Sequence, residues 1–507
     1  MTACVGDELS GCDFGDVRLT SRIVKLASSI CDNPEASINA ACGSFADSKG
    51  AYRFLQNDKV KPEKILASHL NNTWLRMGLE SEPILAIQDT TDLIYTKFPS
   101  IKGLGQRLKA SKGYEKGVTG LLLHTTLAAS MEGVPLGIAK QTYFTFDDVK
   151  KNRGQDASNK RGIQKDFPIT EKASYRWLDH LQALNKLAEQ KKKSIIHVAD
   201  READIFEFLQ IASTGSSRFV VRSSADRLSQ GTGRSKDTPT LSELIAGTAA
   251  LSTIEFEHEN KIIQCEVRSI ATTLRPPQRT PKAQENKLSP IPISVVDVHQ
   301  VNCGENPIHW RLLTNLPVDD LDMVLEIVKI YRHRWAIECF HRILKSGFHI
   351  EEARLANRQR IENFATIISI VSWYIFWLYK FGRSSPSLLA STIIDEGGIK
   401  VLKISAKKLK VKVSPELTIG QALLVIARLG GFLGRKGDGD PGMKSIWRGW
   451  RCLTDRREFL EGMTKHLRTV HKDFPEATFQ LWTQDPIKRK WESVESLPWQ
   501  EGIRRLF

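Results

Sequence analysis

Hydrophobic and polar positions recur along this chain with a period that changes several times. Residues 1–75 carry apolar residues at helical spacing, and beyond position 80 the pattern becomes that of strands. The helical pattern returns over 171–190. The strand-like segments in this part of the chain are 84–89, 121–129, 134–144 and 194–199. Three antiparallel strands followed by a helix and another strand predict an α/β domain, a mixed sheet with flanking helices.

A second strand-rich block, over about 240–315, separates this part from a helical remainder that begins near 385. The strands predicted in the block are 252–257, 262–271, 293–298 and 310–314. We therefore predict three domains. They are a helical N-terminal domain over 1–75, a core over 76–384 that contains the β-rich insertion, and a mostly helical C-terminal domain over 385–507.

Three stretches of unusual composition fall within these domains. The polar segment 147–165 predicts a loop whose basic residues meet either DNA or solvent. Residues 275–290 are rich in Pro, Lys and Gln and predict a flexible linker. The apolar run 364–379 is shorter than the roughly 20 residues that span a membrane, and it contains Thr and Ser. We interpret it as a buried core helix behind the 331–345 segment.

Acidic residues follow two of the predicted strands. An apolar run ends at Asp89, and a second one ends at Asp200, with Glu202 and Asp204 close behind as competing candidates. Each acid taken alone fits a residue that caps a turn or helix. With Glu338, however, they place three acids on three separate elements. Such acids can hold two divalent metal ions for phosphodiester chemistry, and Mg²⁺ suits carboxylate ligands.

One short run combines a phenol, two cations and an acid at helical spacing. The positions i, i+3, i+7 and i+14 of this run are Tyr331, Arg334, Glu338 and Lys345. On a single helix they would project within an arc of about 60°. A carboxylate among cations on one helix face suits metal binding beside phosphate groups, although a solvated charged face has the same pattern.

Composition adds a basic excess to this picture. The formal net charge is +15 and the sequence pI is about 9.3, which favours a polyanionic partner. Arg18, Arg22 and Lys25 lie at helical spacing and are candidate DNA contacts, although a solvated face explains them equally well. The eight cysteines include no Cys-x-x-Cys pair, and residues 1–8 lack the pattern of a signal peptide. We therefore expect a cytoplasmic protein with no membrane association.

These motifs resemble those of a known family, the DDE transposases of bacterial insertion sequences, and within it the insertion-sequence-four family. The resemblance rests on Asp89-Thr-Thr, on Asp200-Arg-Glu-Ala-Asp and on the Tyr-x2-Arg-x3-Glu-x6-Lys spacing from Tyr331. It implies a ribonuclease-H-like catalytic core, an N-terminal region that recognises transposon ends, and a C-terminal region that carries subunit contacts. It also selects Asp200 over its acidic neighbours.

The resemblance implies a role for each candidate residue. Asp89, Asp200 and Glu338 would be catalytic and would hold two Mg²⁺ ions, for which Mn²⁺ can substitute. The residues that would contact DNA are Tyr331, Arg334, Lys345, Arg342, Arg222 and Trp310. Among them Trp310, otherwise a typical core residue of a strand, would stack on a flipped base while a DNA hairpin forms.

Cut-and-paste transposition is the activity that the resemblance implies. A homodimer would pair two terminal inverted repeats, nick them, form and open a hairpin, and transfer the 3′-hydroxyl ends to target DNA. Three alternatives differ in class: a metal-dependent nuclease that does not join ends, a non-catalytic inhibitor that binds transposon ends, and a tyrosine recombinase that uses Tyr331 as nucleophile. The recombinase would leave the strand-end acids unexplained.

Overall fold

The computed structural model describes nine stretches of the chain, which form two compact units. The described residues are 5–107, 117–145, 168–229, 238–258, 261–277, 288–301, 307–473, 478–484 and 491–498. One unit comprises residues 5–30 and 35–380, and the other comprises 31–34 and the chain from 381. The predicted loop 147–165 and most of the predicted linker 275–290 lie outside the described residues.

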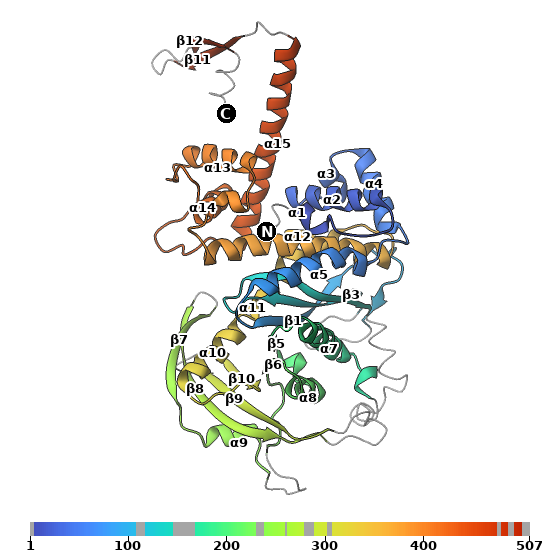
Figure 1. The fold of residues 1–507 in the computed structure, drawn as a ribbon, viewed down its shortest axis with the longest axis vertical. Coiled ribbons are helices and arrows are strands. Elements are labelled where there is room, and N and C mark those ends of the chain that lie inside the picture. The colour runs from blue at the N-terminus through green and yellow to red at the C-terminus, as the bar shows by residue number, and fades with distance from the viewer. Residues whose placement is uncertain are drawn as a thin grey trace. The chain divides into compact units, whose positions relative to one another are not determined.

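A mixed ten-stranded sheet runs through the larger unit (Figure 1). The strands follow one another in the order β2-β3-β1-β5-β6-β10-β9-β8-β7, and β4 also pairs with β3. Their bounds are β1 Ile84–Ile94, β2 Gly105–Gln106, β3 Thr119–Ala129, β4 Pro135–Thr145, β5 Ile195–Ala199, β6 Arg218–Arg222, β7 Ser252–His258, β8 Lys261–Leu274, β9 Ile291–Gln300 and β10 His309–Thr314. The mixed α/β class expected from the sequence is therefore confirmed.

The pairing of β1 determines where the two aspartates lie. β1 continues to Ile94, so Asp89 lies within the strand and not at its end as predicted, whereas Asp200 directly follows β5. β1, β3 and β4 form the predicted antiparallel set, and β5 then pairs with β1 in parallel. Ile87 of β1 lies opposite Val198 of β5. Two residues further along the same register, Asp89 and Asp200 come level with each other at neighbouring strands. The two long antiparallel strands and the helix that lie between them in the sequence, β3, β4 and α7, are those predicted from the sequence.

The predicted β-rich insertion does not form a separate sheet. β10 pairs antiparallel with β6, so β7–β10 extend the core sheet at that edge. A hydrophobic core lies under this junction and includes Trp177, Phe206, Phe208 and Phe219, all almost fully buried. Local alternation identified the strands correctly, but it carries no information on which edge they join.

Helices cover the faces of the sheet. In Figure 1, α5 and α12 lie across the antiparallel strands, while α7 and α8 lie together near β5 and β6. The helices of this unit are α1 Val5–Leu9, α2 Val17–Asp32, α3 Ile38–Cys42, α4 Phe45–Gln56, α5 Pro62–Leu79, α7 Tyr175–Gln190, α8 Phe206–Thr214, α9 Leu241–Ala246, α10 Leu321–Arg332, α11 Trp335–Arg342 and α12 Arg358–Ser384.

A buried ionic contact joins the N-terminal helices to the core. The Glu8 side chain is fully buried and contacts His69 Nδ1 at 2.7 Å and Arg76, both on α5. Burial alone would raise the pKa of Glu8, but the hydrogen bonds from His69 and Arg76 lower it to about 2. The contact attaches α1 to α5, and removing one partner of such a buried pair is strongly destabilising.

The apolar segment 364–379 lies within α12, which is long and apolar enough to cross a membrane by length and composition. In its most apolar window, however, 83% of the residues are buried inside the structure. Trp373 donates its indole N–H to the Pro135 carbonyl, and Tyr143 of β4 bonds to Thr366. The helix therefore packs on β4 as a core helix.

The single helix predicted over 331–345 is wrong. α10 ends at Arg332 and α11 begins at Trp335, because the intervening hydrogen bonds tighten: Arg334 N–H donates to the Tyr331 carbonyl at 2.9 Å. After α11 the chain widens into a π-helical turn over Ile343–Gly347. A π turn rotates each residue by less than an α turn does, so Lys345 leaves the direction that an ideal helix would give it.

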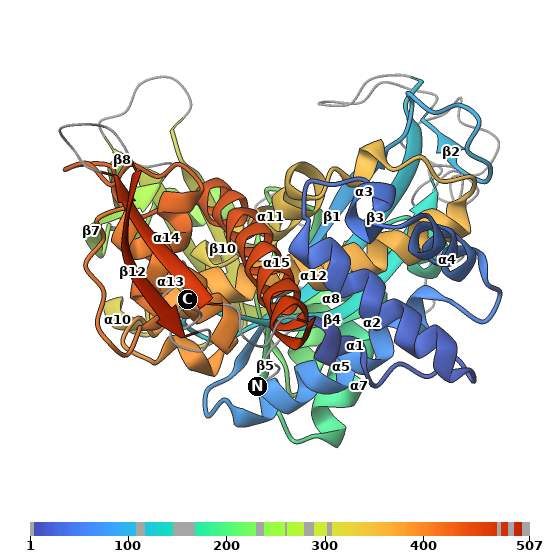
Figure 2. The ribbon, with the colours of Figure 1, turned by 90° about the horizontal axis from the view of Figure 1, so that it is seen from above.

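The second unit is mostly helical, as expected. α13 Glu396–Lys408 and α14 Ile419–Leu429 pack against α15 Met443–Asp473, and Figure 2 shows the two shorter helices beside the long one. A two-stranded antiparallel hairpin, β11 Thr478–Gln484 and β12 Trp491–Pro498, follows α15. The boundaries expected at 75 and 384 stay predictions.

Candidate active site

Asp89 lies on β1 where the strand passes beneath α11. Its side chain is 22% exposed, and its Oδ1 accepts a hydrogen bond from the Thr90 N–H at 2.7 Å. Burial raises the pKa of Asp89 to about 7, and the nearby charges of Asp200 and Glu338 act in the same direction. Asp200 and Glu338, which belong to two other elements, are therefore near enough to Asp89 to act on its carboxylate.

Asp200 directly follows β5 and caps a short 3₁₀ turn. Its Oδ1 accepts a hydrogen bond from the Glu202 N–H at 2.9 Å, and among the described residues no cationic side chain pairs with it. The competing acids are engaged elsewhere. Glu202 forms an ion pair with Arg176 at 2.7 Å, and the buried carboxylate of Asp204 pairs with Arg227. Of the three acids after β5, only Asp200 remains without a cation.

Glu338 lies in the first turn of α11 and contacts a cation of the same segment. Its Oε1 is 2.6 Å from Arg334 Nη2. In the sequence both residues were predicted on one helix face, and in the structure they are brought together despite the break before α11. The ion pair with Arg334 engages one oxygen of the Glu338 carboxylate.

The donor set fits divalent metal ions. It consists of carboxylate oxygens, which Mg²⁺ prefers. Among the described residues, neither Asp89 nor Asp200 forms an ion pair with a Lys or Arg side chain, although the Arg334 guanidinium is near Asp89. His341 Nδ1 lies 3.8 Å from Asp89, but burial lowers the pKa of His341 to about 3, so this imidazole is neutral. No three acidic, His or Cys side chains of the described residues are yet close enough to hold one ion.

A cluster of aromatic and basic side chains adjoins the acids. Tyr331 is 3% exposed, hydrogen-bonds Arg222, and has the Arg334 guanidinium 5.7 Å from its ring centre. Burial raises the pKa of Tyr331 and lowers that of Arg222. Arg222 also donates to the His309 carbonyl at 2.7 Å. Three of the predicted DNA-contacting residues therefore lie together beside the acids.

Trp310 belongs to the same cluster but is only 8% exposed. Its ring stacks on Phe256 at 5.5 Å and meets the edge of Tyr331 at 5.2 Å. In this state Trp310 packs as a core residue, and a base can stack on it only after Phe256 or Tyr331 moves. Its predicted role in hairpin formation stays a prediction.

Lys345 and Arg342 diverge from this cluster. Lys345 donates to the Asp92 carbonyl of β1 at 2.9 Å and lies 3.4 Å from Glu351. Arg342 is exposed and lies 5.8 Å from the ring centre of Trp335, itself 42% exposed. Trp335 was not predicted as a site residue. Its position between Arg334 and Glu338 could have indicated one, because exposed aromatic residues among cations are typical of nucleic-acid sites.

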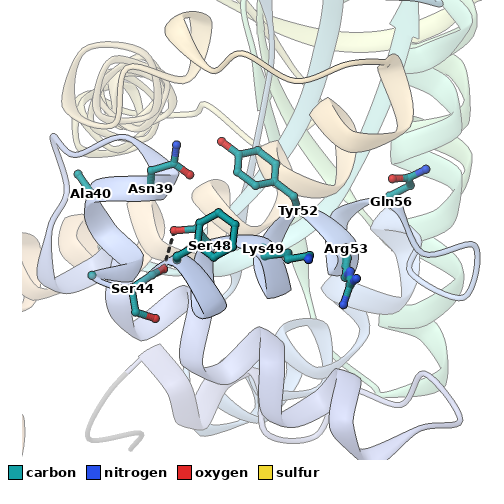
Figure 3. A pocket seen from close by; sticks show the side chains of 10 residues that line it. Asn39, Ala40, Ser44, Ser48, Lys49, Tyr52, Arg53 and Gln56 are labelled. Carbon is teal, nitrogen blue, oxygen red and sulfur yellow. Dashed lines mark hydrogen bonds between the residues drawn. The ribbon is translucent and has the colours of Figure 1, made fainter.

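A second basic surface lies on α4 in the N-terminal region. Phe45, Lys49 and Arg53 recur every four residues along its exposed side, and Phe45 is 84% exposed. With Tyr52 and Gln56 they line a cavity of about 840 Å³ (Figure 3). We call Phe45, Lys49 and Arg53 the α4 stripe.

The cations predicted on α2 are engaged within the protein. Arg22 and Lys25 both pair with Asp47 of α4, at 3.0 and 2.7 Å, and Arg18 pairs with Asp16 at 2.9 Å. Two of them therefore attach α2 to α4. The α4 stripe was not predicted from the sequence. Two cations and one Phe at helical spacing are too few residues to distinguish a binding face from a solvated one.

Comparison with known proteins identifies the class. Three family models match successive parts of the chain: "Transposase DNA-binding" over residues 1–60, "Transposase DDE domain" over 171–374 and "Transposase Tn5 dimerisation domain" over 370–469. The chain therefore belongs to the DDE transposases. Within that class it is similar to the Tn5 transposase, and the DDE-domain match fits the insertion-sequence-four family expected from the motifs.

A more distant likeness links the chain to a solved structure described as the cryo-EM structure of piggyBac transposase synaptic complex with hairpin DNA. The sequence identity is 7% and the TM-score 0.28, with 64% of this chain and 52% of that chain covered. The chain thus spans about half the length of that protein. A likeness at this level carries no conclusion about this chain.

Proposed function

We propose that this protein is a DNA transposase that cuts at transposon ends and joins the resulting 3′-hydroxyl ends to target DNA. The proposal is carried by the parallel pairing of β1 with β5, which brings Asp89 level with Asp200, and by the packing of α11, which bears Glu338, on β1. The family matches support the same activity. Acting on DNA, the protein would work in the bacterial cytoplasm, at the nucleoid.

We infer that the catalytic core is ribonuclease-H-like. Three antiparallel strands, β1, β3 and β4, are followed by α7 and by β5, which pairs parallel to β1. This is the strand and helix order that such a core requires. The strands β7–β10 then form the insertion between the second and third acids.

Asp89, Asp200 and Glu338 would together hold two Mg²⁺ ions, with Mn²⁺ as a substitute. Bound metal would make the attacking oxygen a better nucleophile and stabilise the leaving oxygen. On DNA binding, Glu338 would exchange its contact with Arg334 for the shared metal ions. A DNA phosphate is the natural replacement partner for that guanidinium, because Arg binds phosphate oxygens with two parallel hydrogen bonds. DNA binding and assembly of the acids would then occur together.

The remaining candidates would hold the DNA. Arg334, Arg342 and Lys345 would bind phosphates, Arg222 would contact the transposon end, and Tyr331 would position the backbone. Because Tyr331 is buried and its pKa is raised, its phenol stays protonated, which does not suit a nucleophile. Once exposed by rearrangement, Trp310 would stack on a flipped base during a hairpin step.

Two further regions would complete the synaptic complex. The α4 stripe would contact the terminal inverted repeat, since Lys49 and Arg53 are exposed beside an exposed aromatic ring. The matched dimerisation region, residues 370–469, would join two subunits so that two ends are held at once.

A strand-transfer assay tests the proposal. Purified protein is mixed with a labelled duplex that ends in the element's terminal repeat and with supercoiled target DNA, with and without Mg²⁺. We expect metal-dependent joined product, with a hairpin species visible on a denaturing gel. Metal-dependent cutting without joining would instead identify a nuclease, and end binding without cutting would identify an inhibitor.

The α4 stripe gives a binding prediction. Replacing both Lys49 and Arg53 with Ala is expected to weaken end binding and to lower the slope of log K against log salt by about 1 to 2, because each phosphate contact releases about one counterion. Fluorescence anisotropy at several salt concentrations measures this slope. Arg18→Ala is the matched control, because Arg18 is 88% exposed but lies outside the stripe. If only Arg18→Ala lowered the salt slope, the DNA contact would lie on α2 and not on the α4 stripe.

Tyr331 gives a test between transposase and tyrosine recombinase. Tyr331→Phe keeps the ring that packs on Trp310 and removes only the hydroxyl that bonds Arg222. We expect cleavage to slow by about tenfold, the equivalent of one hydrogen bond of about 1.4 kcal/mol. Single-turnover cleavage measures the rate. Complete loss of cutting, or a covalent protein–DNA product in the wild type, would contradict this role.

A further inference from the structure

A chain of polar side chains lies beneath β1, on the face opposite Asp89, and the proposed reaction does not use it. Because side chains alternate along a strand, Asp89 faces α11 whereas its neighbours Gln88 and Thr90 face α7. Thr90 Oγ1 accepts a hydrogen bond from Arg176 Nε of α7 at 3.0 Å. The strand that carries the first acid is thus held on its rear face by a side chain from α7.

The hydrogen bonds of this chain agree in direction along its whole length. From Arg176 and Thr90 it continues through His124, Gln88, His197 and Asn185, with successive distances of 2.9, 3.4, 3.4 and 2.8 Å. Burial lowers the pKa of His197 to about 3 and that of His124 well below its usual value, so both rings are neutral. A neutral imidazole donates at one nitrogen and accepts at the other. With Arg176 donating to Thr90, one direction of donation satisfies every hydrogen bond of the chain.

Arg176 also reaches the second acid-bearing element. Its Nη2 lies 2.7 Å from the carboxylate of Glu202, and its Nη1 donates to the Ala173 carbonyl at 2.7 Å. Its side chain is only 13% exposed. Two of the residues that Arg176 contacts also bond to the aspartates: Thr90 donates its backbone N–H to Asp89, and Glu202 donates its backbone N–H to Asp200. One guanidinium thus joins the two residues whose backbones hold the two aspartates.

We propose that Arg176 is a positioning residue for the divalent-metal site, which fixes the spacing of Asp89 and Asp200. This inference rests on the proposed function. Arg suits the task because its planar, rigid fork makes several hydrogen bonds in fixed directions, which a single ammonium group does not. Without it, β1 and the turn after β5 lose their shared contact, although both strands still pair. The carboxylates then hold metal in a wider range of geometries and bind it less tightly.

Metal binding by the full chain without DNA tests this proposal, with Mn²⁺ as the probe and the free ion measured by electron paramagnetic resonance. We expect Arg176→Lys and Arg176→Met to raise the Kd for Mn²⁺ by about tenfold, the lower end of effects seen for residues behind metal ligands. High Mn²⁺ should restore their cleavage activity. Glu202→Gln removes the charge that pairs with Arg176 but keeps the backbone N–H that bonds Asp200, so we expect a smaller increase in the Kd.

Lys140→Met is the matched control. Lys140 also links a strand to α7, through Asp179 at 2.9 Å, and is similarly half-buried, but it contacts neither acid-bearing segment. We expect its Mn²⁺ affinity to equal that of the wild type. Should Arg176→Met fail to fold, Thr90→Val removes the hydroxyl that bonds Arg176 and His124 but keeps the Arg176–Glu202 pair, and it is expected to raise the Kd by about threefold.

The outcomes separate this inference from the proposed function. Folded Arg176 and Thr90 variants with a Kd within about twofold of wild type would overturn the positioning role alone. A wild type that binds Mn²⁺ no better than Asp89→Asn would overturn the metal site itself, and with it the proposed function.

Discussion

Glu338→Gln should abolish both cutting and joining while DNA end binding persists. Glu338 is the third carboxylate of the site, and losing a charged ligand removes several kcal/mol of transition-state stabilisation, which corresponds to a rate reduction on the order of 10³-fold or more. End binding should be unchanged or slightly tighter, because the substitution releases Arg334, now 2.6 Å from the Glu338 carboxylate, to bind phosphate. Single-turnover cleavage and strand transfer, with binding measured alongside, give both quantities.

Glu352→Gln is the matched control for this prediction. Glu352 is also a glutamate, its side chain is 74% exposed, and its carboxylate lies 3.5 Å from His349 Nδ1. We expect wild-type rates from it. Cleavage by Glu338→Gln within tenfold of wild type would remove Glu338 from the catalytic set and leave its pairing with Arg334 as its main role.

The second large effect is a pH dependence that arises from Asp89. Its pKa is about 7 in the folded, metal-free protein, against a usual value of 3.8. The folded state therefore holds a proton that the unfolded state has lost between about pH 4 and pH 7. The stabilisation from that proton is fully present below about pH 4 and is lost as the pH rises through 7. The loss amounts to at most about 4 kcal/mol, for a shift of about three pKa units.

Thermal unfolding in EDTA, followed from pH 4.5 to 8.5, measures this dependence. We expect Asp89→Asn, which stays neutral, to melt at a higher temperature than wild type above pH 7 and to lose the pH-dependent part of the difference. Mg²⁺ should bind more tightly as the pH rises to 7, with release of about one proton, and should restore wild-type stability. Asp319→Asn, at an exposed position, is the control. Parallel curves for wild type and Asp89→Asn would refute a raised pKa at Asp89.

Much of the core was predictable because its signals are local. The apolar run that ends in Asp200 identified β5 and the acid that follows it, and the strands of the β-rich block were found by alternation. The run that ends in Asp89 identified only the first half of β1, which continues to Ile94. The spacing of Arg334 and Glu338 correctly predicted that they lie together. These predictions need only the repeat of a strand or a helix, which neighbouring residues fix.

The parts that could not be predicted depend on long-range contacts. The break at His333 and the π turn after Arg342 moved Lys345 toward Asp92 of β1. Trp310, in a strand pattern that fits either a core or a binding residue, is covered by Phe256 from a strand more than 50 positions earlier. No local pattern specifies which distant ring will cover another.

By itself the sequence determined the kinds of groups available for catalysis, the elements that carry them and the family to which they belong. Only the tertiary structure decided which of those groups meet. Parallel pairing of β1 with β5 brought Asp89 level with Asp200, and the fold of α7 against their rear face brought Arg176 to the neighbours of both. The physical reason is that periodicity is set by covalent geometry along a few residues. Strand register and helix docking, in contrast, are set by the packing of side chains that are far apart in the sequence, more than a hundred positions for β1 and β5.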